Sequence, residues 1–230
     1  MGYMIMSHFV PENGEEKEIA RKKDSIVSLS PFTPLNSYLT GEPMTTISEK
    51  YDTILASLRP LTSTDPIELA KAAMGNGTIS LHGPEHHFLD GAAFLTALKN
   101  AGMPMDYETN LRALAERSLK MPGAMCGYWG VCGSVASIGA VLSILDQTGP
   151  LSRDEAYQSH MEFTSSLLLG MSRIGGPRCC KRNAFLALLY GAEYAKKHYG
   201  VTLDVSRPVV CEFSPSNKDC LGPSCPFHPQ

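Results

Sequence analysis

The chain has 230 residues, of which 43% are hydrophobic and 19% are charged, so it is long and apolar enough to bury a core. Its formal net charge of −3 excludes the broad positive field that nucleic-acid binding usually needs. The N-terminus turns polar by Ser7, and no apolar run approaches the ~20 residues that span a bilayer. We therefore expect a cytoplasmic protein with no nucleic-acid partner and no membrane helix.

Most of the chain carries helical signals. Apolar residues recur at helical spacing between capping, Gly and Pro residues. Thr64 or Asp65 before Pro66 predicts one capped helix start, and Ser152 with Glu155 predicts another through a capping box. The predicted helices span residues 45–60, 63–74, 83–102, 106–121, 132–147, 152–171 and 177–200.

The predicted fold class is mainly α, because only residues 201–210 alternate like a strand. Residues 1–45 are rich in Pro, Ser and Thr and are predicted as an N-terminal arm or cap, followed by a single helical domain over 46–205. Within this domain the small-residue helix 132–147 has the pattern of a central buried helix. The tail 206–230 is irregular and poor in apolar residues, so we expect a bound metal to order it against the core.

Seven cysteines, all in the C-terminal half, are the strongest chemical signal. In a chain without an export signal, clustered cysteines indicate metal binding or thiol chemistry rather than disulfides. A buried structural role is the alternative for any single one of them. The predicted metal ligands are Cys126, Cys132, Cys179, Cys180, Cys211, Cys220 and Cys225.

Cys179 and Cys180 stand side by side at a predicted helix start, at its third and fourth positions. Backbone N–H groups there lack intrahelical partners and favour a thiolate. Neighbours on a helix point about 100° apart, so we expect one metal ligand and one reactive or second-site thiol, with Cys179 as the catalytic candidate. The surrounding basic residues are predicted to bind an anionic substrate, namely Arg178, Lys181 and Arg182.

Two further segments are candidate sites. The glycine-rich loop between Cys126 and Cys132 brings a thiol to another helix start, with Trp129 either as core filler or as a wall over a cofactor. The stretch HGPEHHFLD is predicted to supply a general base or additional ligand from another helix start, where a neutral imidazole is favoured. Capping and packing are the alternative for these residues, which are Glu85, His86 and His87.

The tail carries Cys211, Cys220 and Cys225, with His228 close behind, and these thiols are predicted to bind a metal. The chain contains no P-loop and no dinucleotide-binding glycine motif, so nucleotide-driven chemistry is disfavoured.

The segments GPEHHFLDGAAFLTAL, PGAMCGYWGVCGSVASIGA, GGPRCCKRNAFLAL and CPFH resemble a family of functionally uncharacterised, cysteine-rich domains of anaerobic bacteria and archaea. Members of this family occur alone or joined to methyltransferase-like modules. The resemblance covers roughly residues 75–230 and implies a shared cysteine and histidine site, but it gives no reaction.

Together these features predict an iron–sulfur protein that acts as a lyase or sulfur-transfer enzyme on a small anionic or sulfur-bearing substrate. A four-iron (4Fe–4S) cluster takes four thiolates, so seven cysteines allow four plus three, and three ligands leave one iron open as a Lewis acid. The alternatives are a non-catalytic zinc-binding or metal/sulfur-carrier module and a thiol redox protein that uses Cys179 and Cys180. A homodimer or a methyltransferase-like partner is the expected assembly.

Overall fold

The computed structural model describes residues 44–229, which all belong to one compact unit. The predicted arm or cap over residues 1–45 therefore lies, apart from its last two residues, outside the described residues. Within the described range the chain forms helices and irregular segments and no strand, which confirms a mainly α fold.

The helices agree closely with the predicted ones, except that a single turn, α5, interrupts the glycine-rich loop. They are α1 (Met44–Leu58), α2 (Pro66–Met74), α3 (His86–Asn100), α4 (Tyr107–Ser118), α5 (Met125–Tyr128), α6 (Gly133–Leu145), α7 (Glu155–Ile174) and α8 (Cys180–Tyr194). A π-helical turn, Ala195–Tyr199, extends α8, and the tail contains two 3-10 turns, Ser214–Ser216 and Gly222–Ser224.

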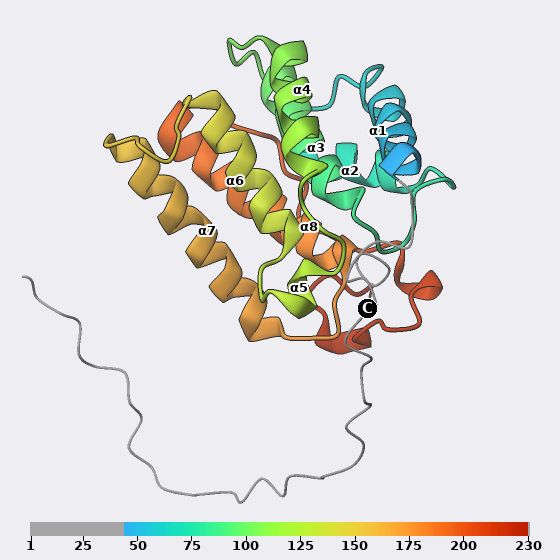
Figure 1. Cartoon of the computed structure of the whole chain (residues 1–230). Coiled ribbons are helices and arrows are strands. Elements are labelled where there is room, and N and C mark those ends of the chain that lie inside the picture. The colour runs from blue at the N-terminus through green and yellow to red at the C-terminus, as the bar shows by residue number, and fades with distance from the viewer. Residues whose placement is uncertain (1–43, 230) are drawn as a thin grey trace, which may run out of the picture. The chain divides into compact units, whose positions relative to one another are not determined.

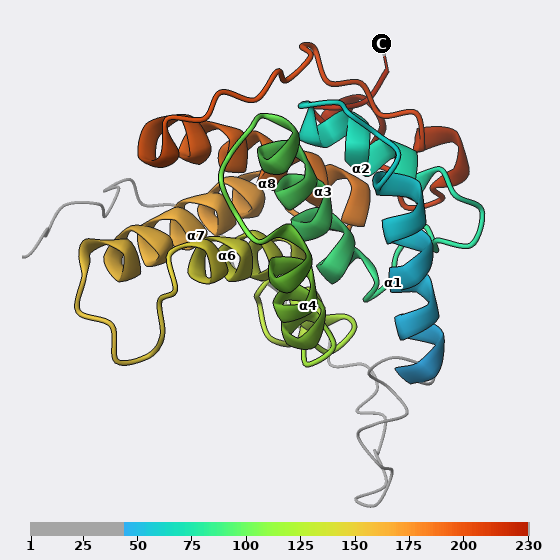
Figure 2. The same ribbon diagram turned by 90° about the horizontal axis from the view of Figure 1, so that it is seen from above.

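Helix α3 is the centre of the fold. Every residue from His86 to Leu98 is buried, and α3 contacts α1, α2, α4, α6 and α8. In Figures 1 and 2, α1 and α2 lie on one side of α3, whereas α6 and then α7 lie on the other. Helix α6 has no exposed residue and contacts α3, α4, α7 and α8, which confirms the predicted central buried helix over residues 132–147, although α3 is buried more completely. The small residues of α6 serve close packing against its neighbours, while the polar start of α3 conceals its complete burial from a hydrophobic pattern.

Two predicted helix starts need correction. The cap of α7 is Asp154, which accepts from Tyr157 N–H at 3.0 Å, whereas the hydroxyl of Ser152 accepts from Gly149 N–H in the preceding turn. The cap of α8 is Cys179, whose backbone is extended, so Cys179 and Cys180 are the cap and first residue rather than the third and fourth positions.

The candidate strand over residues 201–210 does not form, because the backbone of this segment bonds to side chains of α2 and its cap instead of a partner strand. Ser206 N–H donates to Asp65 Oδ2 at 2.9 Å, and Lys71 Nζ donates to the carbonyl of Val210 at 2.7 Å. These bonds lay the start of the tail along α2, beside α8 (Figure 2).

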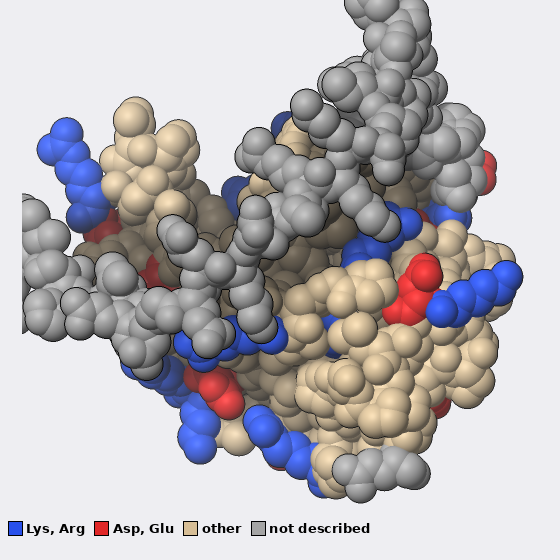
Figure 3. Space-filling model, turned by 90° about the horizontal axis from the view of Figure 1, so that it is seen from below, with Lys and Arg blue, Asp and Glu red and all other residues tan. Residues whose placement is uncertain are grey.

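No helix in the described range combines the length and apolar character needed to cross a bilayer. On the face shown in Figure 3, Lys and Arg side chains lie dispersed around a broad uncharged area, with acidic side chains among them. Trp129 is 62% exposed, so it is not core filler.

The closest approach of α3 to α6 depends on Gly91. Its N–H donates to Ser137 Oγ at 2.9 Å, and a Cβ at this position would lie 2.8 Å from both Leu114 Cδ2 and Ser137 Oγ. We expect Gly91→Ala to lower the free energy of unfolding by about 1–3 kcal/mol, because overpacking exceeds the gain in helix propensity. Urea unfolding followed by circular dichroism measures this change.

Gly77→Ala is the matched control, since a Cβ there would meet nothing within 4 Å. It should change the free energy of unfolding by less than ~0.5 kcal/mol. Equal effects of the two substitutions would contradict the close contact between α3 and α6.

Candidate functional site

Four cysteines from distant parts of the chain converge at the start of α8. Cys179 directly precedes this helix, and Cys211, Cys220 and Cys225 lie on the tail, yet all four line one small cavity. Burial raises the pKa of the Cys211 thiol, and the other three thiols are near enough to raise it further. The structure thus brings the three predicted tail ligands together and supplies Cys179 as a fourth.

One aromatic side chain anchors the tail beside this cavity. Phe227 is 6% exposed and packs edge-on against Phe185, with 5.6 Å between ring centroids. Its carbonyl accepts from Cys211 N–H at 2.7 Å. Burial therefore contributes more to tail order than the sequence predicts, although most of the remaining tail is irregular and partly or fully exposed.

Several N–H groups point at the cavity sulfurs. Cys179 Sγ accepts from Arg182 N–H at 3.5 Å and from Asn217 Nδ2 at 3.7 Å, and Cys220 Sγ accepts from Gly222 N–H at 3.4 Å. The surrounding chain therefore supplies both sulfurs with N–H donors.

A buried lysine faces the same cavity. Lys181 is 2% exposed, and its Nζ lies 5.0 Å from the centroid of the Phe213 ring and 3.4 Å from the carbonyl oxygen of Ser80. Burial lowers the pKa of Lys181, whereas the thiol of Cys180, the carboxyl groups of Asp90 and Glu85 and, least of all, the thiol of Cys179 act in the opposite direction. Since a buried charge needs compensation, a lysine here is matched to negative charge on the sulfurs.

The size of the cavity limits what it can hold. Its volume of about 20 Å³ is enough for one water molecule or one metal ion and for no organic substrate. A single zinc ion, with Zn–S bonds of ~2.3 Å, would need its four sulfurs about 3.8 Å apart. Within residues 44–229, no three His, Cys, Asp or Glu side chains are arranged to hold one metal ion. A multinuclear cluster, in which each iron takes its own sulfur, needs the four thiols farther apart than a single ion does.

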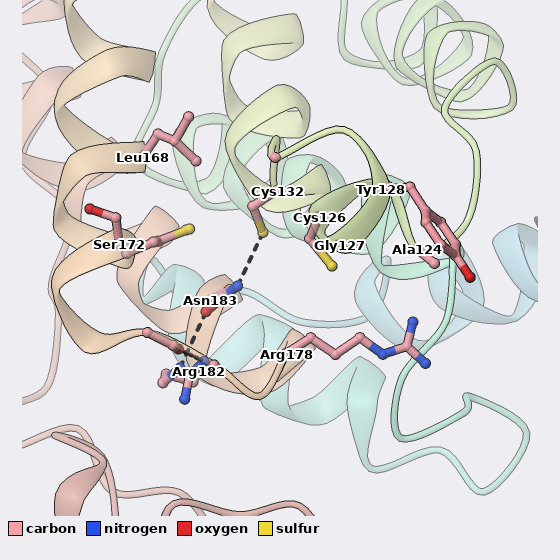
Figure 4. Close-up of a pocket in the computed structure, with 14 residues that line it drawn as sticks. Ala124, Cys126, Gly127, Tyr128, Cys132, Leu168, Ser172, Arg178, Arg182 and Asn183 are labelled. Atoms are coloured by element: carbon pink, nitrogen blue, oxygen red, sulfur yellow. Dashed lines mark hydrogen bonds between the residues drawn. The ribbon is translucent and has the colours of Figure 1, made fainter. Parts of the chain in front are cut away.

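The other three cysteines lie on two adjoining cavities. Cys126 and Cys132 line a cavity of 910 Å³, and Figure 4 shows their sulfurs facing the same space as Arg178. Cys126 and Arg178 also line a second cavity of 210 Å³, together with Cys180. Cys179 and Cys180 therefore face different sites, as predicted, but the cause is the extended backbone of Cys179 before the helix and not the angle between two helical residues.

Neither Cys132 nor Cys180 is stabilised as a thiolate by the chain alone. Burial raises the pKa of Cys180 to about 12 and also raises the pKa of Cys132, even though Asn183 Nδ2 donates to Cys132 Sγ at 3.2 Å. The predicted effect of the helix starts is thus wrong here, because desolvation exceeds it. A bound metal would reverse the balance, since a coordinated thiol loses its proton.

The two histidines have different surroundings. Burial lowers the pKa of His86 to about 3, and its Nε2 lies 3.0 Å from the carbonyl oxygen of Ser80. Glu85 is fully buried and pairs with Lys50 at 3.4 Å. His86 and Glu85 therefore belong to a structural network. His87 instead lines the 210 Å³ cavity, and burial lowers its pKa to about 4. Both imidazoles are neutral, as expected, but through burial.

Of the three basic residues predicted to bind an anion, only Arg178 has a side chain that is available to bind one. Arg178 is exposed, lines both cavities and has no hydrogen-bond or ion-pair partner within the described part of the chain. Arg182 Nη2 donates to the carbonyls of Gly175 and Pro177, each at 2.9 Å, and so holds the loop before α8. Lys181 faces the tail cavity instead.

A hydrogen-bonded chain that the sequence did not predict joins the two sides of the site. Cys180 N–H donates to His82 Nδ1 at 3.3 Å, and His82 Nε2 lies 3.3 Å from Asn217 Oδ1. The amide of Asn217 in turn donates to Cys179 Sγ. Asn217 carries no signal in the sequence, because it is a single asparagine in an irregular tail. Asp90 is also buried, and its helical spacing from His86 is a signal that the sequence does carry.

The neutral His87 predicts a pH dependence of stability. Its folded pKa of about 4 lies below the ordinary value of 6.5, so the folded state resists a proton that the unfolded chain accepts. The contribution is complete above pH ~6.5 and falls by about 3 kcal/mol as the pH drops to ~4. His87→Gln should flatten this slope, measured by urea unfolding between pH 7.5 and 4.5 at ~0.5-unit steps.

Asp90 has the opposite effect on stability: burial raises its pKa to about 7, so its contribution to the free energy of unfolding falls as the pH rises. The unmodified protein and His87→Gln both contain Asp90, so the difference between their pH slopes reports His87 alone. Parallel pH profiles for the two proteins would contradict a buried neutral imidazole.

The comparisons with known proteins give a family and nothing more specific. No curated protein and no solved structure matches the chain significantly. A protein-family model described as a family of unknown function, DUF5714, matches residues 54–228, which include all seven cysteines. The anaerobic hosts and the methyltransferase-like modules implied by the resemblance stay predictions. The match covers most of the chain, and we conclude that the protein belongs to the DUF5714 family of unknown function.

Proposed function

We propose that the protein binds an iron–sulfur cluster through Cys179, Cys211, Cys220 and Cys225 and uses it as an enzyme on a small anionic or sulfur-bearing substrate. The observation that carries this proposal is the convergence of four thiols, from the start of α8 and from the tail, on one small cavity. A 4Fe–4S cluster takes four cysteine thiolates. The four thiols of the cavity match such a cluster in the type of donor atom and in the number of donors.

The surroundings of the four thiols support the same assignment. N–H groups donate to Cys179 and Cys220, and the buried ammonium of Lys181 lies at the cavity wall. A four-thiolate cluster is anionic, so these groups compensate its charge. The rest of the tail has little apolar burial, and cluster binding would provide ordering free energy.

Zinc is the second candidate. The same four thiols match a structural zinc site, His228 lines the same cavity, and a volume of about 20 Å³ accommodates one ion. Against zinc stands the lack, within residues 44–229, of three donors arranged around one point. A zinc site would make the protein a non-catalytic or metal-carrying module.

A redox pair made of Cys179 and Cys180 has less support. The two thiols face different cavities, and burial raises the pKa of Cys180 to about 12. Thiol exchange depends on the thiolate fraction, which is very small at such a pKa.

The substrate side of the proposal rests on the 910 Å³ cavity next to the cluster site. Its volume lies within the range of small-molecule pockets, and Arg178 gives it an available positive charge. Anion binding there suits the proposed lyase or sulfur-transfer chemistry. The cytoplasmic location and the homodimer or methyltransferase-like partner stay predictions from the sequence.

Metal content tests the assignment directly. Anaerobically purified protein should be brown, absorb near ~400 nm and contain iron with equal sulfide. Cys211→Ser/Cys225→Ser should contain about four fewer irons and four fewer sulfides per chain, because two of the four ligands are lost. Iron and acid-labile sulfide assays measure both quantities.

Ser216→Ala, at an exposed position of the same tail, is the control and should keep all its iron. A colourless protein with one zinc per chain would support the zinc alternative, and reversible loss of two thiols in metal-free protein would support the redox one. Full iron content in the double variant would show that the tail thiols are not ligands.

Cluster removal should also loosen the tail. Lys218 is exposed between two proposed ligands, and we expect tryptic cleavage after it to accelerate at least about tenfold once the cluster is removed. Cleavage after the exposed Arg153, in the connection between α6 and α7, is the internal control and should change little. Mass spectrometry of a digestion time course gives both rates. Equal rates with and without the cluster would mean that the tail is ordered by packing alone.

A further inference from the structure

The three cysteines outside the tail cavity also lie together. Cys126 shares the 910 Å³ cavity with Cys132 and the 210 Å³ cavity with Cys180. Cys132 and Cys180 lie close enough for the first thiol to raise the pKa of the second, after the larger effect of burial. No single cavity is lined by all three thiols, and Cys126 is the thiol that both cavities share. They come from α5, from the residue before α6 and from the first residue of α8.

Beside these thiols lies a buried acid with unmet hydrogen-bonding capacity. Asp90 is fully buried, and neither of its carboxylate oxygens makes a hydrogen bond of good geometry, although the Ser134 hydroxyl is near enough to lower its pKa. Asp90 also lies near enough to raise the pKa values of Cys132 and Cys180, which burial has already raised. Buried polar groups are normally satisfied, so this one indicates a missing partner.

A histidine completes the polar side of the smaller cavity. His87 lines it, and its buried Nδ1 makes no hydrogen bond of good geometry, although the Met121 backbone is near enough to raise its pKa. Gly133 permits this position, because a Cβ there would overlap the imidazole ring. The start of α6 is therefore shaped around His87, directly beside Cys132. The smaller cavity is thus lined by the thiols of Cys126 and Cys180 and by the His87 imidazole, donor types that bind soft and borderline metals.

We propose that Cys126, Cys132 and Cys180 hold a second iron–sulfur cluster, with one iron left without a protein thiolate and open to the larger cavity. The inference requires the same class of cofactor as the proposed function but a different set of ligands. Three protein ligands leave a coordination position for an exogenous molecule, as in metal sites that act as Lewis acids. Asp90 and His87 then lie next to the bound group and supply polar contacts to it.

Arg178 sets the class of the exogenous ligand. It lines both cavities, and within residues 44–229 its guanidinium has no other partner. Arginine binds carboxylates and phosphates through paired hydrogen bonds. Figure 4 shows it projecting along the cavity wall near Cys126. The expected ligand is a small anion that presents a sulfur or oxygen donor to the open iron.

Iron content of reciprocal variants tests the second cluster. Cys126→Ser should lower the iron and sulfide of anaerobically purified protein by about half while the tail cluster remains, and Cys211→Ser/Cys225→Ser should remove the other half. Full iron in Cys126→Ser and loss in the tail variant would overturn this inference and leave the proposed function standing. The reverse result would overturn the proposed function alone. Cys126 is partly exposed on a short turn, and circular dichroism checks that the variant folds.

A ligand titration of the unmodified protein tests the open position without relying on any substitution. Mercaptoacetate should change the electron paramagnetic resonance spectrum of the reduced protein, whereas cysteamine, with the same thiol and a positive charge, should need at least about tenfold more. Arg178→Gln should raise the half-saturating mercaptoacetate concentration about tenfold, and the control Arg173→Gln, at an exposed position near the end of α7, should not. An unchanged spectrum, or equal responses to both thiols, would overturn the proposal.

Discussion

The site depends on the change of backbone direction between Cys179 and Cys180. Cys179 is extended and caps α8, whereas Cys180 is the first helical residue, so two neighbouring thiols leave the chain toward different cavities. One meets three thiols of the tail, and the other meets thiols from α5 and from the start of α6. A shift of one residue at this helix start would take both thiols away from their partners, which explains why the loop before α8 is held by the buried guanidinium of Arg182.

The polar start of α3 is the second constraint. Glu85, His86 and Lys181 are buried. Glu85 forms an ion pair with the partly buried Lys50, and Lys181 Nζ is hydrogen-bonded to His86 Nε2. Burying so many ionisable groups is costly unless they are matched, and here the matching fixes the face of α3 that supports the site. The chain from Cys180 through His82 and Asn217 to Cys179 then joins the two thiol groups. We therefore expect a change of charge at the tail thiols to alter the electrostatic surroundings of Cys180 through these contacts.

The sequence predicted the helices well because their signals are local: Asp65 before Pro66, and Gly200 after the turn that ends α8, both act within one turn. It also predicted that Cys179 and Cys180 would face different ways. It did not predict which cysteines meet, because Cys179 and Cys225 are joined by the path of the tail and not by spacing. The candidate strand over residues 201–210 does not form, also because of contacts that the sequence does not reveal. Asp65, the cap of α2, accepts a hydrogen bond from this segment, and Lys71 of α2 donates one to it. The burial that raises the pKa of Cys180 likewise depends on tertiary packing.

The central claim is that four thiols from α8 and the tail surround an inorganic cluster. The Fe K-edge X-ray absorption spectrum of anaerobically purified, full-length protein tests it most directly, because it reports the neighbours of the metal. We predict a first shell of sulfur and a second shell of iron at the short distance found only in clusters. Iron without iron neighbours, or a protein whose only metal is zinc in a sulfur shell, would contradict the account.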